Sequence, residues 1–361
     1  MKSKTQINLD GKTILITGGA GFIGAALTLQ LFKKMKNGTI INIDNINDYY
    51  DPKLKLYRLG LIKEAAKKSN VFYVFVKGNI TDSNLVQHTF SKYKPSIVVN
   101  LAAQAGVRYS IDHPDSYIEN NIIGFYEILQ ACRFSYTNEH KGVEHLIYAS
   151  SSSVYGGNKK VPFSTEDKTD NPVSLYAATK KSNELLAYSY SKLFDIPTTG
   201  LRFFTVYGPA GRPDMFYYSA TEKLARGETI QIFNYGDCKR DFTYIDDIVE
   251  GIIRVMQGAP ERKNGEDGLP IAPHSLYNIG GGTPEKLLDY ISILQEELLK
   301  AGILPENYDF EAHINFVGMQ PGDIPVTYAD STALKDDFDF TPKIGIREGL
   351  HNFVLWYKLY N

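Results

Sequence analysis

The stretch Gly18-Gly19-Ala20-Gly21-Phe22-Ile23-Gly24 constrains the fold of this chain more than any other feature. It lies between an apolar run, Thr13–Thr17, and a segment with helical periodicity. Glycines at such a turn let the backbone approach a ligand closely, and the free N–H groups at the start of the helix favour a phosphate. A second apolar run ends at Asp44, 20 residues after Gly24. Because a carboxylate at that point can accept hydrogen bonds from both ribose hydroxyls of an adenosine, the pattern predicts a dinucleotide site.

The three spaced glycines and Asp44 also indicate which dinucleotide is bound. We expect Gly18 to form the tight turn, Gly21 to let the backbone approach the pyrophosphate, and Gly24 to let the helix pack on the strand. Asp44 would repel a 2′-phosphate, and Asn45-Ile46 directly after it offers no cation to attract one. The sequence therefore predicts NAD and not NADP.

Short apolar runs alternate with amphipathic segments over the first 150 residues. Apolar runs without polar alternation, separated by helices, are typical of parallel strands that are covered on both faces. The predicted fold class is therefore α/β, with a doubly wound parallel sheet, a Rossmann fold. The predicted strands are residues 13–17, 39–43, 71–76, 97–100, 145–149 and 198–204, and the predicted helices are residues 23–35, 54–67, 84–91, 117–133 and 177–193.

Beyond Gly208 the sequence changes to Gly/Pro-rich loops and shorter elements. This change predicts a second, smaller α/β lobe at the C-terminal end. We expect residues 1–204 to form the NAD-binding domain, with residues 242–258 returning to it, and residues 205–361 to form the substrate-binding domain.

Composition excludes several classes of protein. The 39 Lys and Arg residues balance 41 Asp and Glu residues, whereas nucleic-acid binding generally needs a basic face. No apolar run approaches the roughly 18–20 residues that span a bilayer, and no secretory or lipidation signal is evident, so we expect a cytoplasmic protein without nucleic-acid or membrane partners. The two cysteines, Cys132 and Cys238, and the seven scattered histidines predict neither a disulfide framework nor a metal site.

A Tyr-x-x-x-Lys pattern, Tyr176 and Lys180, lies in one of the predicted helices. Residues i and i+4 share a helix face, so we expect Lys180 to place a positive charge near the phenol and to lower its pKa from about 10. Such a phenol could serve as a general base near neutral pH. The polar run Ser150–Ser153 follows a predicted strand, at the end where α/β sheets bind ligands. Ser151 is expected to hydrogen-bond the oxygen from which Tyr176 removes the proton.

These features resemble the extended short-chain dehydrogenase/reductase family, whose members share the spacing of the glycines here and a Ser-Tyr-Lys triad. Matching stretches run in order from Lys12 to about Ala329. The resemblance implies that Ser151, Tyr176 and Lys180 are catalytic. Asn79 stands where the family commonly has Asp facing the adenine amine, and Asn121 matches the Asn that supports the nicotinamide side. The implied cofactor contacts, besides Gly18, Gly21, Gly24 and Asp44, are Phe22, Ile23, Asn45, Asn79, Ile80, Leu101, Ala102, Ala103, Gln104, Asn121, Tyr176 and Lys180.

Three stretches, residues 104–110, 205–215 and 319–323, closely resemble the UDP-glucuronate 4-epimerases of this family. Dehydratase relatives carry an Asp-Glu pair at the position of Ser152-Ser153, and decarboxylases tend to have Glu at Ser153, so the resemblance speaks against both reactions. Arg212 presents a planar fork that suits a substrate carboxylate. The implied substrate contacts are Arg108, Ser151, Ser152, Ser153, Thr205 and Arg212 together with Gln231 and Phe233 at the uracil, Arg240 at the diphosphate, and Asp323.

The expected function is therefore 4-epimerisation of UDP-glucuronic acid through a 4-keto intermediate, with hydride passing to NAD and back. The alternatives are a UDP-glucuronate decarboxylase and a 4-epimerase of neutral UDP-sugars. A regulator that only binds NAD would have no need of the triad. The resemblance also implies a homodimer paired through the helices at residues 117–133 and 177–193.

Overall fold

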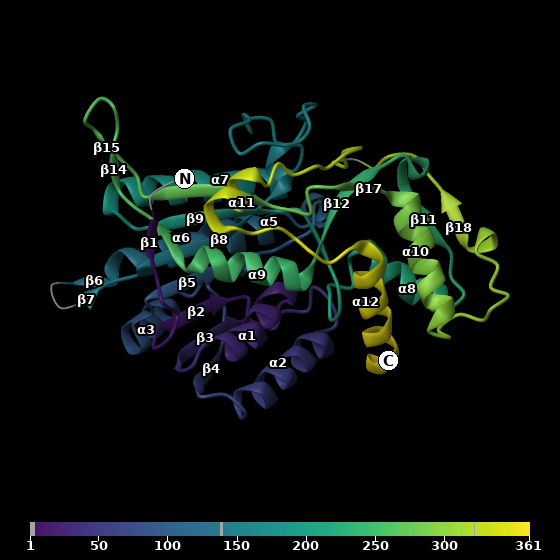
Figure 1. The fold of residues 1–361 in the computed structure, drawn as a ribbon, viewed down its shortest axis with the longest axis horizontal. Coiled ribbons are helices and arrows are strands. Elements are labelled where there is room, and N and C mark those ends of the chain that lie inside the picture. Colours follow the sequence, from purple (N-terminus) through teal and green to yellow (C-terminus); the bar gives the residue numbers. More distant parts are fainter. Residues whose placement is uncertain (1–3, 138–139, 321) are drawn as a thin grey trace.

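A seven-stranded sheet forms the centre of the molecule in the computed structural model, which describes residues 4–137, 140–320 and 322–361 (Figure 1). All neighbouring strands are parallel, which confirms the predicted fold class. The strands, in spatial order, are β16 (His274–Ile279), β9 (Thr198–Phe203), β8 (His145–Ser151), β5 (Ile97–Asn100), β2 (Thr13–Thr17), β3 (Gly38–Asp44) and β4 (Val71–Lys77).

Helices cover both faces of this sheet, because alternate strand residues carry apolar side chains to opposite sides. Ile14 and Ile16 pack in one core, whereas Leu15 packs in the other. The first face carries α1 (Phe22–Lys34), α2 (Pro52–Ala66) and α9 (Ile245–Met256). The second face carries α3 (Ser83–Tyr93), α6 (Gly124–Phe134) and α7 (Leu175–Phe194).

The strand order reverses at β2, which lies between β3 and β5. In open α/β sheets, ligands bind outside the carboxyl ends of the strands at such a switch point. The fold therefore directs the residues that follow β2, β3 and β5 toward one site.

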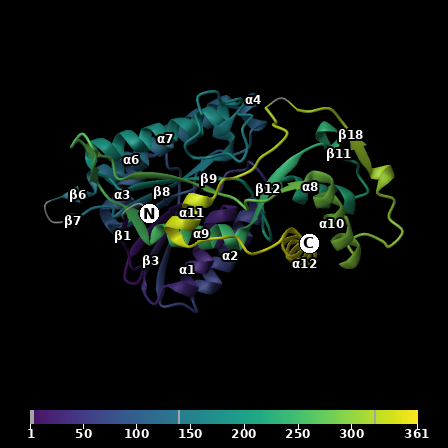
Figure 2. The same ribbon diagram turned by 45° about the horizontal axis from the view of Figure 1, so that its top comes forward.

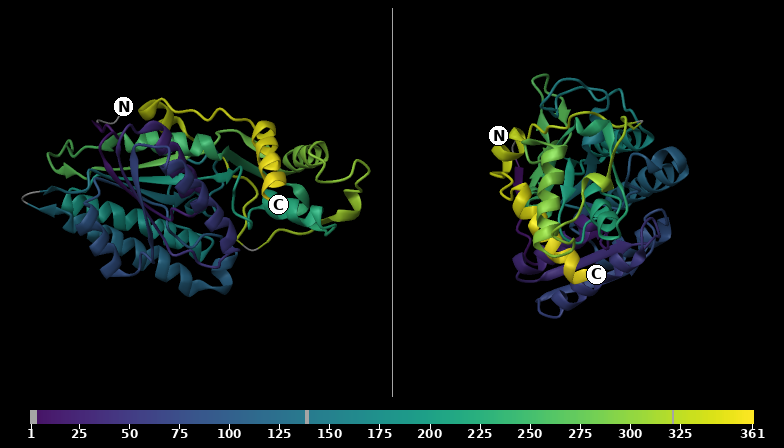
Figure 3. Two further views of the ribbon diagram at one scale, coloured as in Figure 1. Left: turned by 90° about the horizontal axis from the view of Figure 1, so that it is seen from below. Right: turned by 90° about the vertical axis from the view of Figure 1, so that its right-hand side faces the viewer.

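A smaller lobe extends from the carboxyl ends of these strands (Figures 2 and 3). A three-stranded sheet connects it to the first lobe, and two short parallel strands lie at its far side. Its elements are β10 (Thr205–Tyr207), β12 (Lys239–Tyr244), β17 (Pro284–Lys286), β11 (Ile230–Ile232), β18 (Ile314–Phe316), α8 (Phe216–Ala225), α10 (Leu287–Lys300) and α12 (Ile346–Tyr360).

The chain returns to the first lobe three times, at α9, at β16 and at α11 (Thr332–Phe338), which packs against β16. Helix α9 packs against α1, in the region expected for residues 242–258. Strand β16 then joins the edge of the large sheet, although its residues fall in the part expected to form the second lobe. The six residues of β16 mix polar and apolar side chains, so the sequence pattern of this strand did not stand out from the surrounding loops.

The remaining elements are short connections and edge pairs. They are β1 (Lys4–Gln6), β6 (Tyr136–Thr137), β7 (His140–Lys141), β13 (Gly258–Pro260), β14 (Lys263–Asn264), β15 (Pro270–Ile271), α4 (Tyr109–Asp112), α5 (Pro114–Tyr117), α11 (Thr332–Phe338), the π-helix η1 (Ile118–Ile123), and the 3₁₀ helices η2 (Ser152–Tyr155), η3 (Phe233–Gly236) and η4 (Glu311–His313). No helix in the described part of the chain combines the length and apolar character that crossing a membrane requires.

Candidate active site

A cleft of about 430 Å³ lies where the carboxyl ends of β2, β3, β5 and β8 face the second lobe. All the expected cofactor contacts except Asn121 line this cleft. Five of the expected substrate contacts line it as well, namely Ser151, Ser152, Ser153, Thr205 and Arg212. The fold thus brings residues from many separate segments of the sequence to one cavity.

The glycine turn, residues 18–24, forms a cradle that a side chain would fill. Gly18 has a φ of +70°, and a Cβ there would lie 2.9 Å from the backbone nitrogen of Ala102. A Cβ on Gly24 would lie 2.3 Å from the carbonyl oxygen of Gly18. Helix α1 begins after Gly21 without a side-chain cap, so its first N–H groups remain available to an anion. The cradle therefore fits the pyrophosphate of a dinucleotide.

Asp44, at the end of β3, also holds the glycine turn in place. Its carboxylate accepts hydrogen bonds from the backbone N–H of Ala20 at 3.0 Å and of Ile46 at 2.8 Å. Lys55 of α2 also lines the cleft, and the charge of Asp44 acts on it. Burial lowers the pKa of Lys55, and Asp44 opposes that change. The two residues that follow Asp44 in the sequence, Asn45 and Ile46, carry no positive charge, as expected.

Asn121 lies behind the wall of the cleft, buried in η1. Its side chain accepts a hydrogen bond from the N–H of Gln104 at 2.7 Å and donates to the Gln104 carbonyl at 3.0 Å and the Thr179 hydroxyl at 3.0 Å. Asn121 thus joins the cleft-lining segment at Gln104 to the helix that carries Tyr176. The Asn121 side chain therefore positions the segment that lines the cleft and does not line the cleft itself.

Ser174 starts helix α7 and places Tyr176 in its first turn. The Ser174 hydroxyl accepts a hydrogen bond from the N–H of Ala177 at 3.1 Å, which satisfies one of the free donors at the helix start. Lys180 follows one turn later, is buried, and donates from Nζ to the carbonyl oxygen of Ala149 at 2.8 Å. Burial lowers the pKa of Lys180 to about 8.

The pKa of Tyr176 does not follow the sequence expectation. Burial raises this pKa above its ordinary value, and a hydrogen bond with Ser151 and the charge of Arg212 act in the opposite direction without overcoming it. Lys180 is not among the groups that shift this pKa. The buried phenol is therefore harder to ionise than a free tyrosine side chain.

Arg212 pairs with Asp214, which the sequence analysis did not single out. Arg212 Nε donates to Asp214 Oδ1 at 3.0 Å, and Nη2 pairs with Oδ2. Burial disfavours the charge of Arg212, but Asp214 raises its pKa, so the guanidinium stays charged. Tyr49 also donates to Asp214, at 3.2 Å, from the first lobe. The signal that was available is the i, i+2 spacing of opposite charges in Arg-Pro-Asp.

The residues that line the cleft include few acids. Ser153 donates its backbone N–H to the Ser151 hydroxyl at 3.2 Å, at the start of η2. Among the described residues that line the cleft, Asp44 is the only carboxylate, and it belongs to the cofactor end. The site therefore contains no pair of carboxylates for the acid and base steps of a dehydration.

Three expected substrate contacts meet outside this cavity. Arg108 pairs with Asp323 at 2.8 Å, and its guanidinium lies 4.2 Å from the ring centre of Phe233. Pro321, in the same stretch as Asp323, lies outside the described residues. Gln231 is exposed on β11, and Arg240 on β12 donates to the carbonyls of Lys239 and Pro325. The structure leaves the expected contacts of these last two residues with the nucleotide as predictions.

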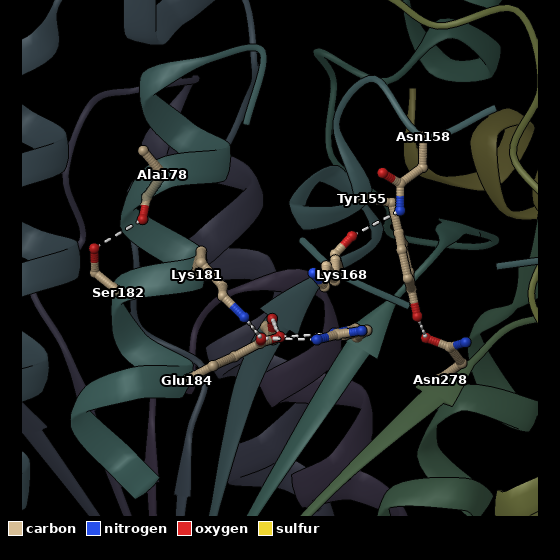
Figure 4. Close-up of polar contacts among 10 residues, drawn as sticks. Tyr155, Asn158, Lys168, Ala178, Lys181, Ser182, Glu184 and Asn278 are labelled. Atoms are coloured by element: carbon tan, nitrogen blue, oxygen red, sulfur yellow. Dashed lines mark hydrogen bonds and ion pairs between the residues drawn. The ribbon is translucent and has the colours of Figure 1, made fainter. Parts of the chain in front are cut away.

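A buried ion pair anchors the start of the serine run through Ser150. Glu184 of α7 accepts hydrogen bonds from Arg202 at 2.8 Å and from the Ser150 hydroxyl at 2.6 Å. Lys181 approaches the same carboxylate at 3.6 Å (Figure 4). Although burial opposes it, Arg202 holds the pKa of Glu184 below its ordinary value. Sequence reasoning missed this pair, because a helix and a distant strand supply its members.

A family model described as GDP-mannose 4,6 dehydratase matches residues 15–353. The chain belongs to this family. The resemblance to the extended short-chain dehydrogenases/reductases is thereby confirmed, and the match spans both lobes.

Relatives within the family carry other activities than the name of the model suggests. Protein CapI of Staphylococcus aureus is 46% identical, with 96% of this chain and 98% of CapI aligned. UDP-glucuronate 4-epimerase 4 of Arabidopsis thaliana is 41% identical, with 99% of this chain and 77% of that protein aligned. A crystal structure of UDP-glucuronic acid 4-epimerase from Bacillus cereus, in complex with UDP-glucuronic acid and NAD, is similar with a TM-score of 0.80 and 30% identity, covering 97% of this chain and 100% of the other.

Proposed function

We propose that this protein is a UDP-glucuronate 4-epimerase, which interconverts UDP-glucuronic acid and UDP-galacturonic acid. At the coarser level it is an NAD-dependent nucleotide-sugar 4-epimerase, as its relatives and its structural neighbours are. The single observation that carries the finer assignment is Arg212, a charged guanidinium in the same cleft as Ser151 and Tyr176.

The guanidinium of Arg212 has room for a second carboxylate. Asp214 takes Nε and Nη2, and Nη1 has no hydrogen-bond partner in the described part of the chain. An arginine can bind one carboxylate on each of two edges, because its five N–H donors lie in one plane. Ser152, Ser153 and Thr205 also line the cleft and can donate further hydrogen bonds to the carboxylate of a uronic acid.

The glycine turn, Asp44 and the segment 101–104 would hold the NAD. When bound, this cofactor supplies a hydride acceptor and donor for C4 of the sugar, and its oxidised ring carries a positive charge. The fit rests on the tight turn at Gly18 and Gly24, where a Cβ would overlap backbone atoms.

Tyr176 is the base in the proposed reaction. It takes the proton from the 4-hydroxyl group as the carbon below is oxidised, and it returns the proton after the ring has presented its other face. Ser151 shares the charge that develops on the same oxygen, because it already hydrogen-bonds Tyr176. The ammonium group of Lys180 is a proton donor close to this site, and burial lowers its pKa to about 8.

The 4-keto uronic acid formed in this way is a β-keto acid, which loses CO₂ readily. The loss is fastest when the bond to the carboxylate stands perpendicular to the carbonyl plane. Arg212 and the hydroxyl groups beside it would hold the carboxylate away from that alignment. Epimerisation without decarboxylation therefore depends on the same residue that selects the substrate.

The test is to incubate the purified protein with UDP-glucuronic acid, without adding NAD, and to follow the sugar protons by NMR. UDP-galacturonic acid should appear. In the Tyr176→Phe variant, its rate of formation should fall by a factor of about 10²–10⁴. That variant should still bind NAD. A pentose product would assign the protein as a decarboxylase instead, and turnover only of neutral UDP-sugars would contradict the role of Arg212.

A further inference from the structure

Arg58 connects the glycine turn to the loop that carries Arg212. This residue of α2 is only 1% exposed, yet it lies at the boundary between the two lobes. Its Nη1 donates to the carbonyl of Ala20 at 3.1 Å, Nε donates to the carbonyl of Ala210 at 2.9 Å, and Nη2 donates to the carbonyl of Gly211 at 2.8 Å. Tyr50 accepts a fourth bond from Nη1, at 2.6 Å.

This guanidinium is buried without an opposite charge. All four of its partners are neutral oxygens, and no acidic side chain in the described part of the chain pairs with it. Burying a cation without an ion pair is costly, so its hydrogen bonds have to be well made. An apolar side chain could fill the same space, but it could not hold three backbone carbonyls at fixed positions.

The loop that Arg58 holds has a disfavoured conformation. Ala210 has a φ of +52°, in the left-handed region that residues with a Cβ rarely adopt. On the next residue, a Cβ added to Gly211 would lie 1.7 Å from the hydroxyl of Tyr217. The loop is thus packed closely against Tyr217 on one side and hydrogen-bonded to Arg58 on the other. Such a conformation persists only where the surroundings determine it.

We propose that Arg58 is a positioning residue that fixes the Arg212 loop (residues 208–215) relative to the glycine turn of the cofactor site. It sets the distance between the substrate carboxylate and the carbon that is oxidised, because one rigid fork holds both segments. The expected effect on substrate binding rests on the proposed function, whereas the expected effect on the loop does not.

The experiment compares Arg58→Met, Arg58→Lys and the double variant Arg58→Met/Ala210→Gly with the unaltered protein. Arg254→Met is the matched control, since Arg254 is also a helix arginine that bonds a backbone carbonyl, and it does not line the cleft. Hydrogen exchange of the backbone amides in residues 208–215 reports on the loop, and calorimetry measures the affinity for UDP and for UDP-glucuronic acid.

Arg58→Met should speed hydrogen exchange in this loop by about tenfold or more. It should weaken the binding of UDP-glucuronic acid by about tenfold, whereas the affinity for UDP should change less than about threefold. The effects of Arg58→Lys should lie between those of Arg58→Met and the unaltered protein, because an ammonium group keeps the charge but cannot hold three carbonyls. Glycine adopts a positive φ without cost, so Ala210→Gly should restore part of the loss. Arg254→Met should change neither readout.

Unchanged exchange in the loop, or an equal loss of UDP and UDP-glucuronic acid affinity without rescue by Ala210→Gly, would overturn the proposal. If Arg58→Met does not fold, the same comparison rests on Arg58→Lys. Should the unaltered protein bind UDP-glucuronic acid no better than UDP, the proposed function fails, whereas the exchange result with its rescue still decides the role of Arg58.

Discussion

Arg212 and Asp214 form a two-point ion pair in which Nε of the arginine lies 3.0 Å from Oδ1 of the carboxylate. Tyr49 donates to the other oxygen of Asp214 from the opposite lobe. The pair holds the guanidinium in the cleft, and Nη1 has no hydrogen-bond partner among the described residues.

Arg212→Ala should lose at least about 100-fold in epimerisation rate, since a hydrogen-bonded charge pair with the substrate contributes about 1.5–3 kcal/mol and the carboxylate is then also unrestrained. The turnover that remains should release CO₂ and form a UDP-pentose. The measurement is product analysis by NMR together with CO₂ release. An Arg212→Ala protein with an unchanged rate and no CO₂ would show that Arg212 does not hold the carboxylate.

Asp214→Asn should raise the KM for UDP-glucuronic acid by about three- to tenfold, because a neutral amide holds the Arg212 guanidinium less firmly than a carboxylate does. The affinity for UDP, which has no sugar carboxylate, should stay the same. Steady-state kinetics and UDP calorimetry measure the two effects. A lower KM would mean that Asp214 competes with the substrate for Arg212, and the positioning role would then be wrong.

The pKa of Tyr176 gives a prediction about pH. Burial keeps this pKa above its ordinary value in the cofactor-free protein, so no phenolate should form there at pH 8. The near-ultraviolet difference spectrum between the protein and Tyr176→Phe should therefore lack the phenolate band, and loading with NAD should produce it. Lys180→Met should reduce the band in the loaded protein. A phenolate band already present without cofactor would contradict the raised pKa.

His145 links stability to pH. It is fully buried, and burial lowers its pKa to about 3, so the folded protein keeps it neutral while the unfolded chain takes up a proton below about pH 6.5. Its stabilising contribution is complete above that pH and falls by about 2 kcal/mol between pH 7 and pH 5. His145→Gln should show a smaller loss of unfolding free energy over this range than the unaltered protein. His88→Gln, at an exposed position, is the control that should show no difference.

Local signals were sufficient for six of the seven strands of the large sheet and for most of the cleft. The run Thr13–Thr17, the glycine turn and Asp44 follow one another closely, so their spacing alone predicts where they meet. Tyr176 and Lys180 share one helix, and their position at the cleft follows from that helix.

The homodimer remains a prediction. It is consistent with the exposed apolar side chains on η1, α6 and α7, namely Ile118, Ile123, Tyr126, Leu185 and Tyr188.

Contacts between distant segments could not be predicted in the same way. Arg58 and Lys55 belong to helix α2, whose sequence carries no motif that marks either residue. Glu184 and Arg202 meet because a helix packs on a strand, and Asp214 depends on the conformation of a loop. The raised pKa of Tyr176 results from the depth of the cleft, which motif spacing does not report.

The most direct test of the central claim uses UDP-glucuronic acid that carries deuterium at C4, with the purified protein in ordinary water and no added NAD. If C4 is oxidised and then reduced on its other face by the same retained cofactor, the UDP-galacturonic acid that forms keeps its deuterium. Inversion with replacement of the deuterium by solvent hydrogen, or a failure to invert C4 at all, would contradict the account.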